Sequence, residues 1–585
     1  MSARCATFSS FALAAALSSA AAHAASPAVL ESSGGMVVTA QHLASEVGAA
    51  ILRQGGNAVD AAVAVGYALA VTHPCCGNLG GGGFMTIHLA DGRNTFINFR
   101  EKAPLAARAG MFLDARGNPI GAKSLNGYLA AGVPGTVMGL ETARREYGTL
   151  SRPVLMAASI RLAEQGFILM RGDTDELDAG AAEFRKQPNV AAVFLHQGAP
   201  FKPGERLVQK NLASTLRLIS EVGDAAFYHG PIAAAIAASA HANGGALTLQ
   251  DFAAYGITES APLSCPYRGY TILSAPPPSS GGVILCEMLQ VLQAYPLAAL
   301  GFHSSKSVHL MTEAMRYTYR DRNRYLGDPA FVDNPIARLL SMRHAEAIRA
   351  RILPSRATPS SALGADEADE KAADEKATTT HYSVVDRSGN AVAVTYTIND
   401  DFGAKVIAGN TGFLLNDEMD DFTAKPGAAN LFGLVQGKAN AIAPGKRPLS
   451  SMTPTIVLED GKPVLVVGAP GGSRIITTVL EIIINVIDHG MTLQEAVDAP
   501  RIHHQWWPDT LAGEPFALSA DTVKSLTHMG YHVVRLEPWG TGNAAEVIGI
   551  APADERQARA LGFPRPGVLY GASDSRAPAG SAAAP

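Results

Sequence analysis

The sequence predicts a large, compact protein of the α+β class, built as one big domain or two tightly joined ones. The chain has 585 residues, about four times the roughly 150 residues expected for a single domain. Hydrophobic residues make up 47% of the chain, charged residues 17%, and 58 residues are glycine, which is typical of a globular fold with many tight turns. A helix-forming segment at residues 55–74 and a hairpin-forming segment at residues 378–399 indicate that both kinds of element are present.

The charge distribution argues against nucleic acid as a partner. The formal net charge is −5, and no basic block occurs along the chain, so the electrostatic footprint that phosphate binding requires is missing.

The first residues predict an export signal. One positive charge at Arg4 precedes a short apolar run, residues 11–22, and Ala22-His23-Ala24 fits the small-x-small rule for signal peptidase. The apolar run is shorter than the roughly 20 residues that span a bilayer, and no later stretch reaches that length without a charge or proline. We therefore expect a signal peptide at residues 1–24, no membrane span, and a mature protein in the periplasm or outside the cell.

The helical segment 55–74 has Ala and Val at helical spacing and is followed by Pro74, so it predicts a buried, closely packed helix. Four consecutive glycines, 80–83, come next and lead into a strand-like run. Such a loop occurs where the backbone approaches something closely. A phosphate cradle would need a Lys-Ser/Thr pair after the glycines, which this sequence lacks.

The cysteine pattern leaves the disulfide bonding open. Cys5 leaves with the signal, and the two adjacent cysteines, 75 and 76, would close a strained ring if bonded to each other. Whether Cys265 and Cys286 pair with each other or with Cys75 or Cys76 cannot be deduced from spacing. The chain has no CxxC or HExxH motif, and His503 and His504 beside two tryptophans are typical of packed structure, so we expect neither a metal nor a cofactor.

Residues 354–377 are rich in Ala, Ser and charge and contain no aromatic residue, which predicts a solvated, flexible linker. Two β-rich runs follow, separated by a turn at residues 387–389. If Gly389 takes the left-handed position of a three-residue turn, Thr379 lies opposite Thr397, on the face that also carries His381.

Two facing hydroxyls directly after a linker suggest an N-terminal nucleophile produced by self-cleavage. A threonine hydroxyl needs a base at neutral pH, and the freed α-amino group of the same residue is such a base. The alternative is an ordinary cross-strand threonine pair in a structural sheet.

Ten collinear segments resemble the gamma-glutamyltranspeptidases, among them NLGGGGFM, NFREKAP, PPPSSGG, TTHYSVVDRSGNAVAVTYTIN, NDEMDDF, RPLSSM and GAPGGSR. The resemblance implies an N-terminal-nucleophile fold, an αββα sandwich, that matures by cleavage between Thr378 and Thr379. It implies a large subunit, residues 25–378, and a small catalytic subunit, residues 379–585, joined as a heterodimer. Thr379 matches the nucleophile of the family and Thr397 its supporting threonine.

The resemblance also implies a pocket for the amino-acid end of a γ-glutamyl group. Arg100, Ser450 and Ser451 would bind the α-carboxylate, because a planar guanidinium and hydroxyl donors suit that group. Asn399, Glu418 and Asp421 would bind the α-ammonium. Taken one at a time, each of these residues is equally compatible with an ordinary surface position.

Gly471 and Gly472 precede an apolar helix and match the family's oxyanion site, whose backbone N–H groups stabilise developing charge. Residues 426–437 resemble the lid loop of bacterial members, with Phe432 at its aromatic position.

The sequence thus predicts an exported, self-processing γ-glutamyl hydrolase and transferase. Glutathione and other γ-glutamyl compounds would be the donors, and water, amino acids or short peptides the acceptors. Two other readings remain: an acylase on the same scaffold, specific for a cephalosporin or glutaryl group, and a non-catalytic periplasmic binding protein that keeps the pocket.

Overall fold

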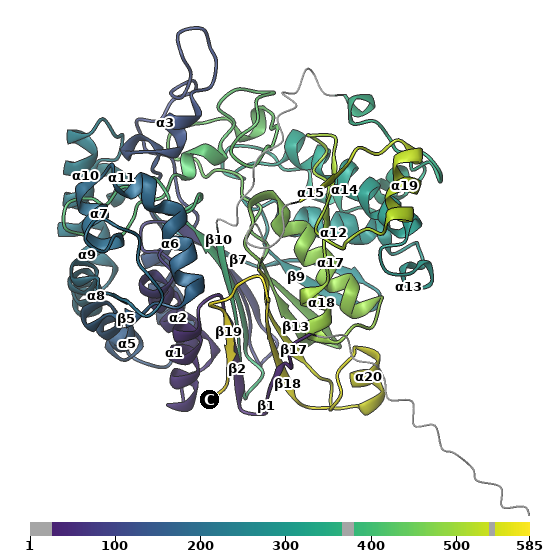
Figure 1. Cartoon of the computed structure of the whole chain (residues 1–585), viewed down its shortest axis with the longest axis horizontal. Coiled ribbons are helices and arrows are strands. Elements are labelled where there is room, and N and C mark those ends of the chain that lie inside the picture. Colours follow the sequence, from purple (N-terminus) through teal and green to yellow (C-terminus); the bar gives the residue numbers. More distant parts are fainter. Residues whose placement is uncertain (1–25, 365–378, 537–543) are drawn as a thin grey trace, which may run out of the picture.

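The computed structural model describes residues 26–364, 379–536 and 544–585. The predicted signal peptide, residues 1–24, and Thr378 lie outside these ranges. Two stacked β-sheets occupy the middle of the molecule, and a layer of helices covers each of them from outside (Figure 1). No helix within the described ranges is long and apolar enough to cross a membrane.

Both large sheets have seven strands, and every neighbouring pair within them is antiparallel. The first sheet contains, in spatial order, β19 (Ser581–Ala583), β2 (Gly35–Thr39), β10 (Thr379–Asp386), β11 (Ala391–Thr397), β3 (Gly82–His88), β4 (Asn94–Asn98) and β7 (Thr258–Ser260). The second contains β1 (Leu30–Ser32), β18 (Leu569–Ser573), β17 (Glu546–Ile550), β13 (Lys462–Val467), β12 (Thr455–Glu459), β9 (Tyr270–Ser274) and β8 (Leu263–Tyr267). Two small sheets are formed by β14 (Ile502–His503), β15 (Leu511–Gly513) and β16 (Val533–Arg535), and by β5 (Phe167–Ile168) and β6 (Arg206–Leu207).

The helices divide between the two outer layers (Figure 1). The layer on the first sheet comprises α1 (His42–Arg53), α2 (Ala58–Thr72), α4 (Thr136–Tyr147), α5 (Arg152–Gln165), α6 (Arg171–Phe184), α7 (Pro188–Phe194), α8 (Lys210–Val222), α9 (Asp224–Tyr228), α10 (Pro231–Ala242) and α11 (Leu249–Ala253). The layer on the second sheet comprises α12 (Gly281–Leu292), α13 (Leu297–Leu300), α14 (Ser305–Tyr325), α15 (Ile336–Leu339), α16 (Met342–Arg349), α17 (Ile475–Ile487), α18 (Leu493–Asp498), α19 (Ala520–Met529) and α20 (Glu555–Ala560). The short α3 (Gly121–Leu125) lies apart from both, against residues 418–421.

The central strands are buried on both faces, and alternate side chains enter different cores. Val384 of β10 and Val394 of β11 pack in the core beneath the first helical layer. Their neighbours Val385 and Ala393 point the other way, into the core between the two sheets, where Ile456 of β12 meets them. This alternation follows from the two-residue period of a strand, and it produces the αββα order of layers.

Helix α2 is the buried helix that the sequence predicts at residues 55–74. Asn57 caps its first turn by accepting a hydrogen bond from the Asp60 backbone N–H, while the Asp60 carboxylate accepts one from the backbone N–H of Asn57. Every residue of the helix is buried, which is possible because most of them are Ala or Val. The helix ends at Thr72, and His73 is its C-cap residue, directly before Pro74, as expected.

The prediction of a flexible linker at residues 354–377 is wrong for its first part, residues 354–364. Residues 354–364 pack against the second helical layer: Ala357 is buried and donates its N–H to the Met529 carbonyl, 2.8 Å away. Ser360 is fully buried, and its hydroxyl donates to the Trp506 carbonyl at 2.6 Å. Small side chains such as Ala and Ser are buried at little entropic cost, so composition alone could not exclude an ordered segment. The rest of the predicted linker lies outside the described ranges.

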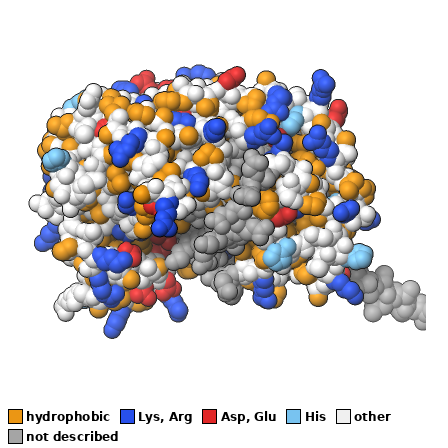
Figure 2. Space-filling model, turned by 90° about the horizontal axis from the view of Figure 1, so that it is seen from above, with side chains coloured by type: hydrophobic (Ala, Val, Ile, Leu, Met, Phe, Trp, Pro, Cys, Tyr) orange, Lys and Arg blue, Asp and Glu red, His pale blue; other side chains and the backbone are white. Residues whose placement is uncertain are grey.

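The surface seen from above carries basic, acidic and apolar side chains interspersed with one another (Figure 2). This mixture agrees with the nearly balanced charge of the whole chain, −5 over 585 residues.

The contact between the two sheets at Gly571 gives a test of the packing. A Cβ atom at this position of β18 would lie 2.7 Å from the Ala582 Cβ and 2.6 Å from the Met36 sulfur. Gly571→Leu should therefore destabilise the protein by about 1–3 kcal/mol through overpacking, measured as a lower melting temperature. Gly256→Leu is the control, since nothing lies within 4 Å of its Cβ position. Equal melting temperatures for the two variants would contradict the sheet packing described above.

Candidate active site

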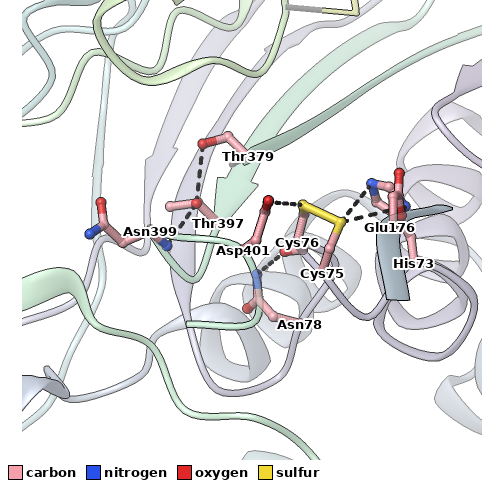
Figure 3. Close-up of a disulfide and its surroundings, with 9 residues drawn as sticks. All are labelled: His73, Cys75, Cys76, Asn78, Glu176, Thr379, Thr397, Asn399 and Asp401. Carbon is pink, nitrogen blue, oxygen red and sulfur yellow. Dashed lines mark hydrogen bonds and ion pairs between the residues drawn. A yellow bond between two sulfur atoms is a disulfide. The ribbon is translucent and has the colours of Figure 1, made fainter. Parts of the chain in front are cut away.

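Two threonine hydroxyls face each other at the ends of adjacent central strands. Thr379 begins β10, Thr397 ends β11, and the two residues are direct partners in the antiparallel ladder. Their Oγ1 atoms are 3.2 Å apart, and the backbone N–H of Asn399 donates to Thr397 Oγ1 at 2.9 Å (Figure 3). Both threonines are almost completely buried.

The predicted hairpin register is confirmed over its whole length. The pairs run from Thr379–Thr397 to Val385–Ala391, and Gly389 in the turn has a φ of +91°, the left-handed conformation that glycine adopts without strain. His381 faces Thr395, and its Nδ1 and the Thr395 hydroxyl lie 2.8 Å apart.

The glycine run 80–83 approaches the backbone of β11, which explains its composition. A Cβ on Gly81 would lie 2.0 Å from the Thr397 carbonyl oxygen, and one on Gly83 would lie 2.5 Å from the Thr395 carbonyl oxygen. The sequence predicted that this backbone approaches something closely. The structure shows that it approaches the backbone of β11, so the glycine run packs against the strand that carries Thr397.

A single pocket brings together the residues that the sequence placed in a site. It is lined by Arg100, Thr379, Thr397, Asn399, Glu418, Asp421, Phe432, Leu434, Ser450, Ser451, Met452, Gly472 and Ile475. Of the predicted catalytic and substrate-binding residues only Gly471 is absent from this lining. The contributing segments lie far apart in sequence, so the fold and not the local chain assembles the pocket.

The charged groups of the pocket are bound to one another. Arg100 is fully buried, and its guanidinium donates to the carboxylates of Glu418 and Asp421. Its Nε donates to the Pro448 carbonyl at 3.3 Å. The sequence analysis assigned Arg100 and the two carboxylates to opposite ends of a ligand, whereas the structure shows them in direct contact.

Burial shifts the protonation of the acids around Arg100. Desolvation raises the pKa of Glu418 well above its usual range, and it raises the pKa of Glu101 to about 7. One oxygen of Glu418, Oε2, has no hydrogen-bond partner among the described residues. A donor that enters the pocket therefore finds an acceptor that is already desolvated.

Gly471 and Gly472 form the turn that precedes α17. Both have positive φ, +117° and +53°, which is why side chains are disfavoured there. A Cβ on Gly472 would lie 2.3 Å from the Phe432 ring. The backbone of Gly472 is thus packed directly under an aromatic side chain of the predicted lid segment.

The predicted lid segment, residues 426–437, is anchored over the pocket by polar contacts. The Leu431 N–H donates to the Asp420 carboxylate at 2.9 Å, and the Phe432 carbonyl accepts a hydrogen bond from Gln505 Nε2 at 2.9 Å. Phe432 itself is buried. Burial raises the pKa of Asp420 to about 6.

The sequence analysis named no site residue on α14. Arg322 of this helix is buried, and its Nη2 donates to the Ser451 hydroxyl at 2.9 Å. Gln436 was assigned only to the lid segment, yet its amide donates to the Asp421 carbonyl at 3.1 Å. The available signal was the density of arginines within a helix that also carries apolar residues at helical spacing.

The four cysteines of the described residues form two disulfides: Cys75–Cys76 and Cys265–Cys286. The sequence analysis disfavoured the first and left the second open. The Cys75–Cys76 turn follows α2 and contacts the loop after Thr397, because the Cys75 carbonyl accepts the Phe402 N–H at 2.9 Å and Cys76 Sγ lies 4.0 Å from an Asp401 carboxylate oxygen (Figure 3).

His503 and His504 are packed structural residues, as expected. Burial is the main cause that lowers their pKa values, to about 3 and about 4 respectively, so both rings are neutral. The His503 ring is hydrogen-bonded to the Thr477 hydroxyl, and the His504 ring is hydrogen-bonded to the Asp509 carboxylate.

Comparison with known proteins agrees with this site. The gamma-glutamyltranspeptidase family matches residues 44–584. A glutathione hydrolase proenzyme of Pseudomonas sp. (strain A14) is 55% identical over 97% of this chain and 98% of its own length. The chain belongs to the gamma-glutamyltranspeptidase family, and it is an enzyme of that family.

Two solved structures share its fold. A cephalosporin acylase from Bacillus halodurans superimposes with a TM-score of 0.81 at 25% identity, covering 96% of this chain and 98% of the other. A gamma-glutamyltranspeptidase from Helicobacter pylori superimposes with a TM-score of 0.54 at 45% identity, covering 55% of this chain and 92% of the other.

The packing of Gly472 under Phe432 can be tested with a matched pair of variants. Gly472→Ala should lower turnover of a γ-glutamyl anilide by about tenfold or more, because the added methyl displaces the Phe432 ring from the pocket. Gly461→Ala is the control: its φ is +77°, and nothing lies within 4 Å of its Cβ position. If both variants lose activity equally, backbone strain and not the Phe432 contact is responsible.

Proposed function

We propose that this enzyme cleaves γ-glutamyl amides, glutathione among them, through a γ-glutamyl ester of Thr379, and passes the acyl group to water, amino acids or short peptides. The observation that carries the proposal is the Thr379–Thr397 hydroxyl pair, 3.2 Å apart, in a pocket that also holds one buried arginine and two carboxylates.

The proposal includes maturation by cleavage between Thr378 and Thr379, after removal of a signal peptide at residues 1–24. The products would be a large subunit, residues 25–378, and a small catalytic subunit, residues 379–585, which remain associated through the shared sheets. The relative that is 55% identical is named a proenzyme, and the solved H. pylori chain covers only 55% of this one. Both facts support processing into two chains.

In the proposed chemistry, the freed α-amino group of Thr379 accepts the proton of its own hydroxyl as Oγ1 attacks the γ-carbonyl carbon. The resulting ammonium then protonates the leaving amine, so one group serves both half-steps. Thr397 would hold the Thr379 hydroxyl in line, and the N–H groups of Gly471 and Gly472 would donate to the developing oxyanion. Water or an amine then resolves the ester.

Recognition of the glutamyl head would proceed by exchange of partners. Arg100 would turn from Glu418 and Asp421 to the substrate α-carboxylate, and the two acids would receive the α-ammonium. The zwitterionic head brings one charge of each sign, so every buried charge keeps an opposite partner after binding. This matters because an uncompensated buried charge costs about 3–5 kcal/mol. Ser450, Ser451 and Asn399 would complete the hydrogen bonds.

An acylase with another acyl preference is the second candidate, since the cephalosporin acylase has the higher TM-score, 0.81. A glutaryl group, however, carries no ammonium and would leave Glu418 and Asp421 without a ligand partner. Comparison of kcat/KM on γ-glutamyl and glutaryl anilides decides between the two; a preference for the glutaryl compound would reject our proposal.

Processing and nucleophile are tested together by Thr379→Ala. This variant should remain a single, inactive precursor, because the same hydroxyl is needed for self-cleavage and for turnover. Thr380→Val is the matched control: Thr380 points to the opposite face of β10, and its hydroxyl has no partner among the described residues. A denaturing gel and N-terminal sequencing of the smaller chain provide the measurement. Processing of Thr379→Ala, or a small chain that starts at another residue, would contradict the assignment.

The amine base predicts the pH dependence of the processed enzyme. The kcat/KM should fall on the acid side as the α-amino group gains a proton, from a reference pKa of about 7.7 to 8.0. His381 cannot cause this fall, because burial lowers its pKa to about 3 and the ring stays neutral across the whole range. His381→Gln should therefore keep the same acid limb, and its loss in a folded, processed variant would identify the imidazole as the base.

A further inference from the structure

One buried cation beside the pocket has no role in the chemistry described above. Arg322 lies on α14, its residue is 1% exposed, and it makes no ion pair with any carboxylate of the described residues. A buried guanidinium without an anionic partner is costly. Burial accordingly lowers the pKa of Arg322, to about 10, so the side chain is still charged at neutral pH.

The guanidinium has three branches, and two of them hold the Ser450–Ser451 segment. Nη2 donates directly to the Ser451 hydroxyl at 2.9 Å. Nε donates to the Ser280 hydroxyl at 2.8 Å, and that hydroxyl donates in turn to the Ser450 carbonyl at 2.7 Å. The backbone N–H of Ser280 reaches the same carbonyl at 2.8 Å. Arg322 thus contributes to the position of both serines, directly at Ser451 and through the Ser280 hydroxyl at Ser450.

The third branch leads to the acidic side of the pocket. Nη1 donates to the Gln436 amide oxygen at 3.2 Å, and the amide nitrogen of Gln436 donates to the Asp421 carbonyl at 3.1 Å. Asn440 joins this chain by donating to both the Gln436 oxygen and the Asp421 carbonyl, at 3.1 and 2.6 Å. Arg322 thus links three parts of the site: the Ser450–Ser451 segment, the lid segment and the segment that carries Asp421.

The direction of the Ser451 hydrogen bond has a chemical consequence. Because Arg322 donates to Ser451 Oγ, the serine hydrogen is free to point elsewhere, and Ser451 makes no other side-chain hydrogen bond with the described residues. The Ser451 side chain lines the pocket. A donor polarised by a neighbouring cation makes a stronger hydrogen bond, and a carboxylate oxygen is the acceptor that this arrangement suits best.

We propose that Arg322 is a positioning residue for the α-carboxylate end of the donor substrate: it orients the Ser451 hydroxyl, fixes Ser450, and adds an unpaired positive charge next to Arg100. The inference rests on the proposed γ-glutamyl activity and deepens it. Arg100 already contacts three carboxylates, those of Glu101, Glu418 and Asp421, whereas Arg322 adds a positive charge that has no carboxylate partner among the described residues and can attract an anionic group. A preference for donors with a free α-carboxylate would then follow from both arginines together.

The test uses Arg322→Gln in the full chain, with kinetics on a γ-glutamyl anilide. KM should rise about tenfold or more while kcat stays within about threefold, because the lost interaction binds substrate and transition state alike. Arg322→Lys keeps the charge but not the three-branched geometry, so its KM should lie between wild type and Arg322→Gln. Arg324→Gln is the control: it removes a charge from the same helix at an exposed position, and its KM should be unchanged.

Two outcomes would overturn the inference: a KM for Arg322→Gln within twofold of wild type, or a fall in kcat at unchanged KM. If Arg322→Gln does not fold or process, Ser280→Ala removes only the Nε branch, and a KM unchanged in that variant counts against the proposal. Failure of the wild-type enzyme to turn over the γ-glutamyl anilide would instead reject the proposed function, so the two failures are distinguishable.

Discussion

Strand β10 pairs with β11 in the middle of the first sheet, and the site depends on this pairing. The antiparallel register places Thr379 opposite Thr397, and a slip of β10 by one residue would turn the Thr379 hydroxyl to the other face of the sheet. Alternate residues of the two strands fill two different cores, so such a slip would also expose or mispack their valines. The packing of the sandwich therefore enforces the alignment of the two hydroxyls.

The pocket beside these threonines contains more buried charge than a structural core tolerates without compensation. Arg100 meets this cost by binding Glu418 and Asp421, an arrangement in which removal of one partner costs about 3–5 kcal/mol. In the proposed binding mode, a ligand with one carboxylate and one ammonium would replace both contacts at once. The same side chains would then serve both charge pairing in the protein and recognition of an amino-acid head group.

The walls of the pocket come from elements of both halves of the sandwich. Arg100 follows β4 of the first sheet, Gly472 precedes α17 of the second helical layer, and the lid segment crosses above them. Glycine occurs where backbones or rings meet: Gly81 lies against Thr397, and Gly472 lies under Phe432. These contacts fix distances that a side chain at either glycine would enlarge.

The sequence by itself determined the features that depend on neighbours in the chain. The hairpin register follows from the two-residue period and the Gly389 turn, and α2 follows from its Ala and Val spacing and from Pro74. The site residues could be named from motifs, because each motif is local. What the motifs imply for export and subunit processing stays a prediction.

Tertiary structure alone decided the features that depend on long-range contacts. The ion pairs of Arg100, the buried position of Arg322 and the packing of residues 354–364 each involve partners from elsewhere in the chain. The Cys75–Cys76 bond is local in sequence, yet the spacing of cysteines does not determine which of them pair. In each case local composition is compatible with several environments, and the free energy of burial, which chooses among them, is set by residues that only the folded chain brings into contact.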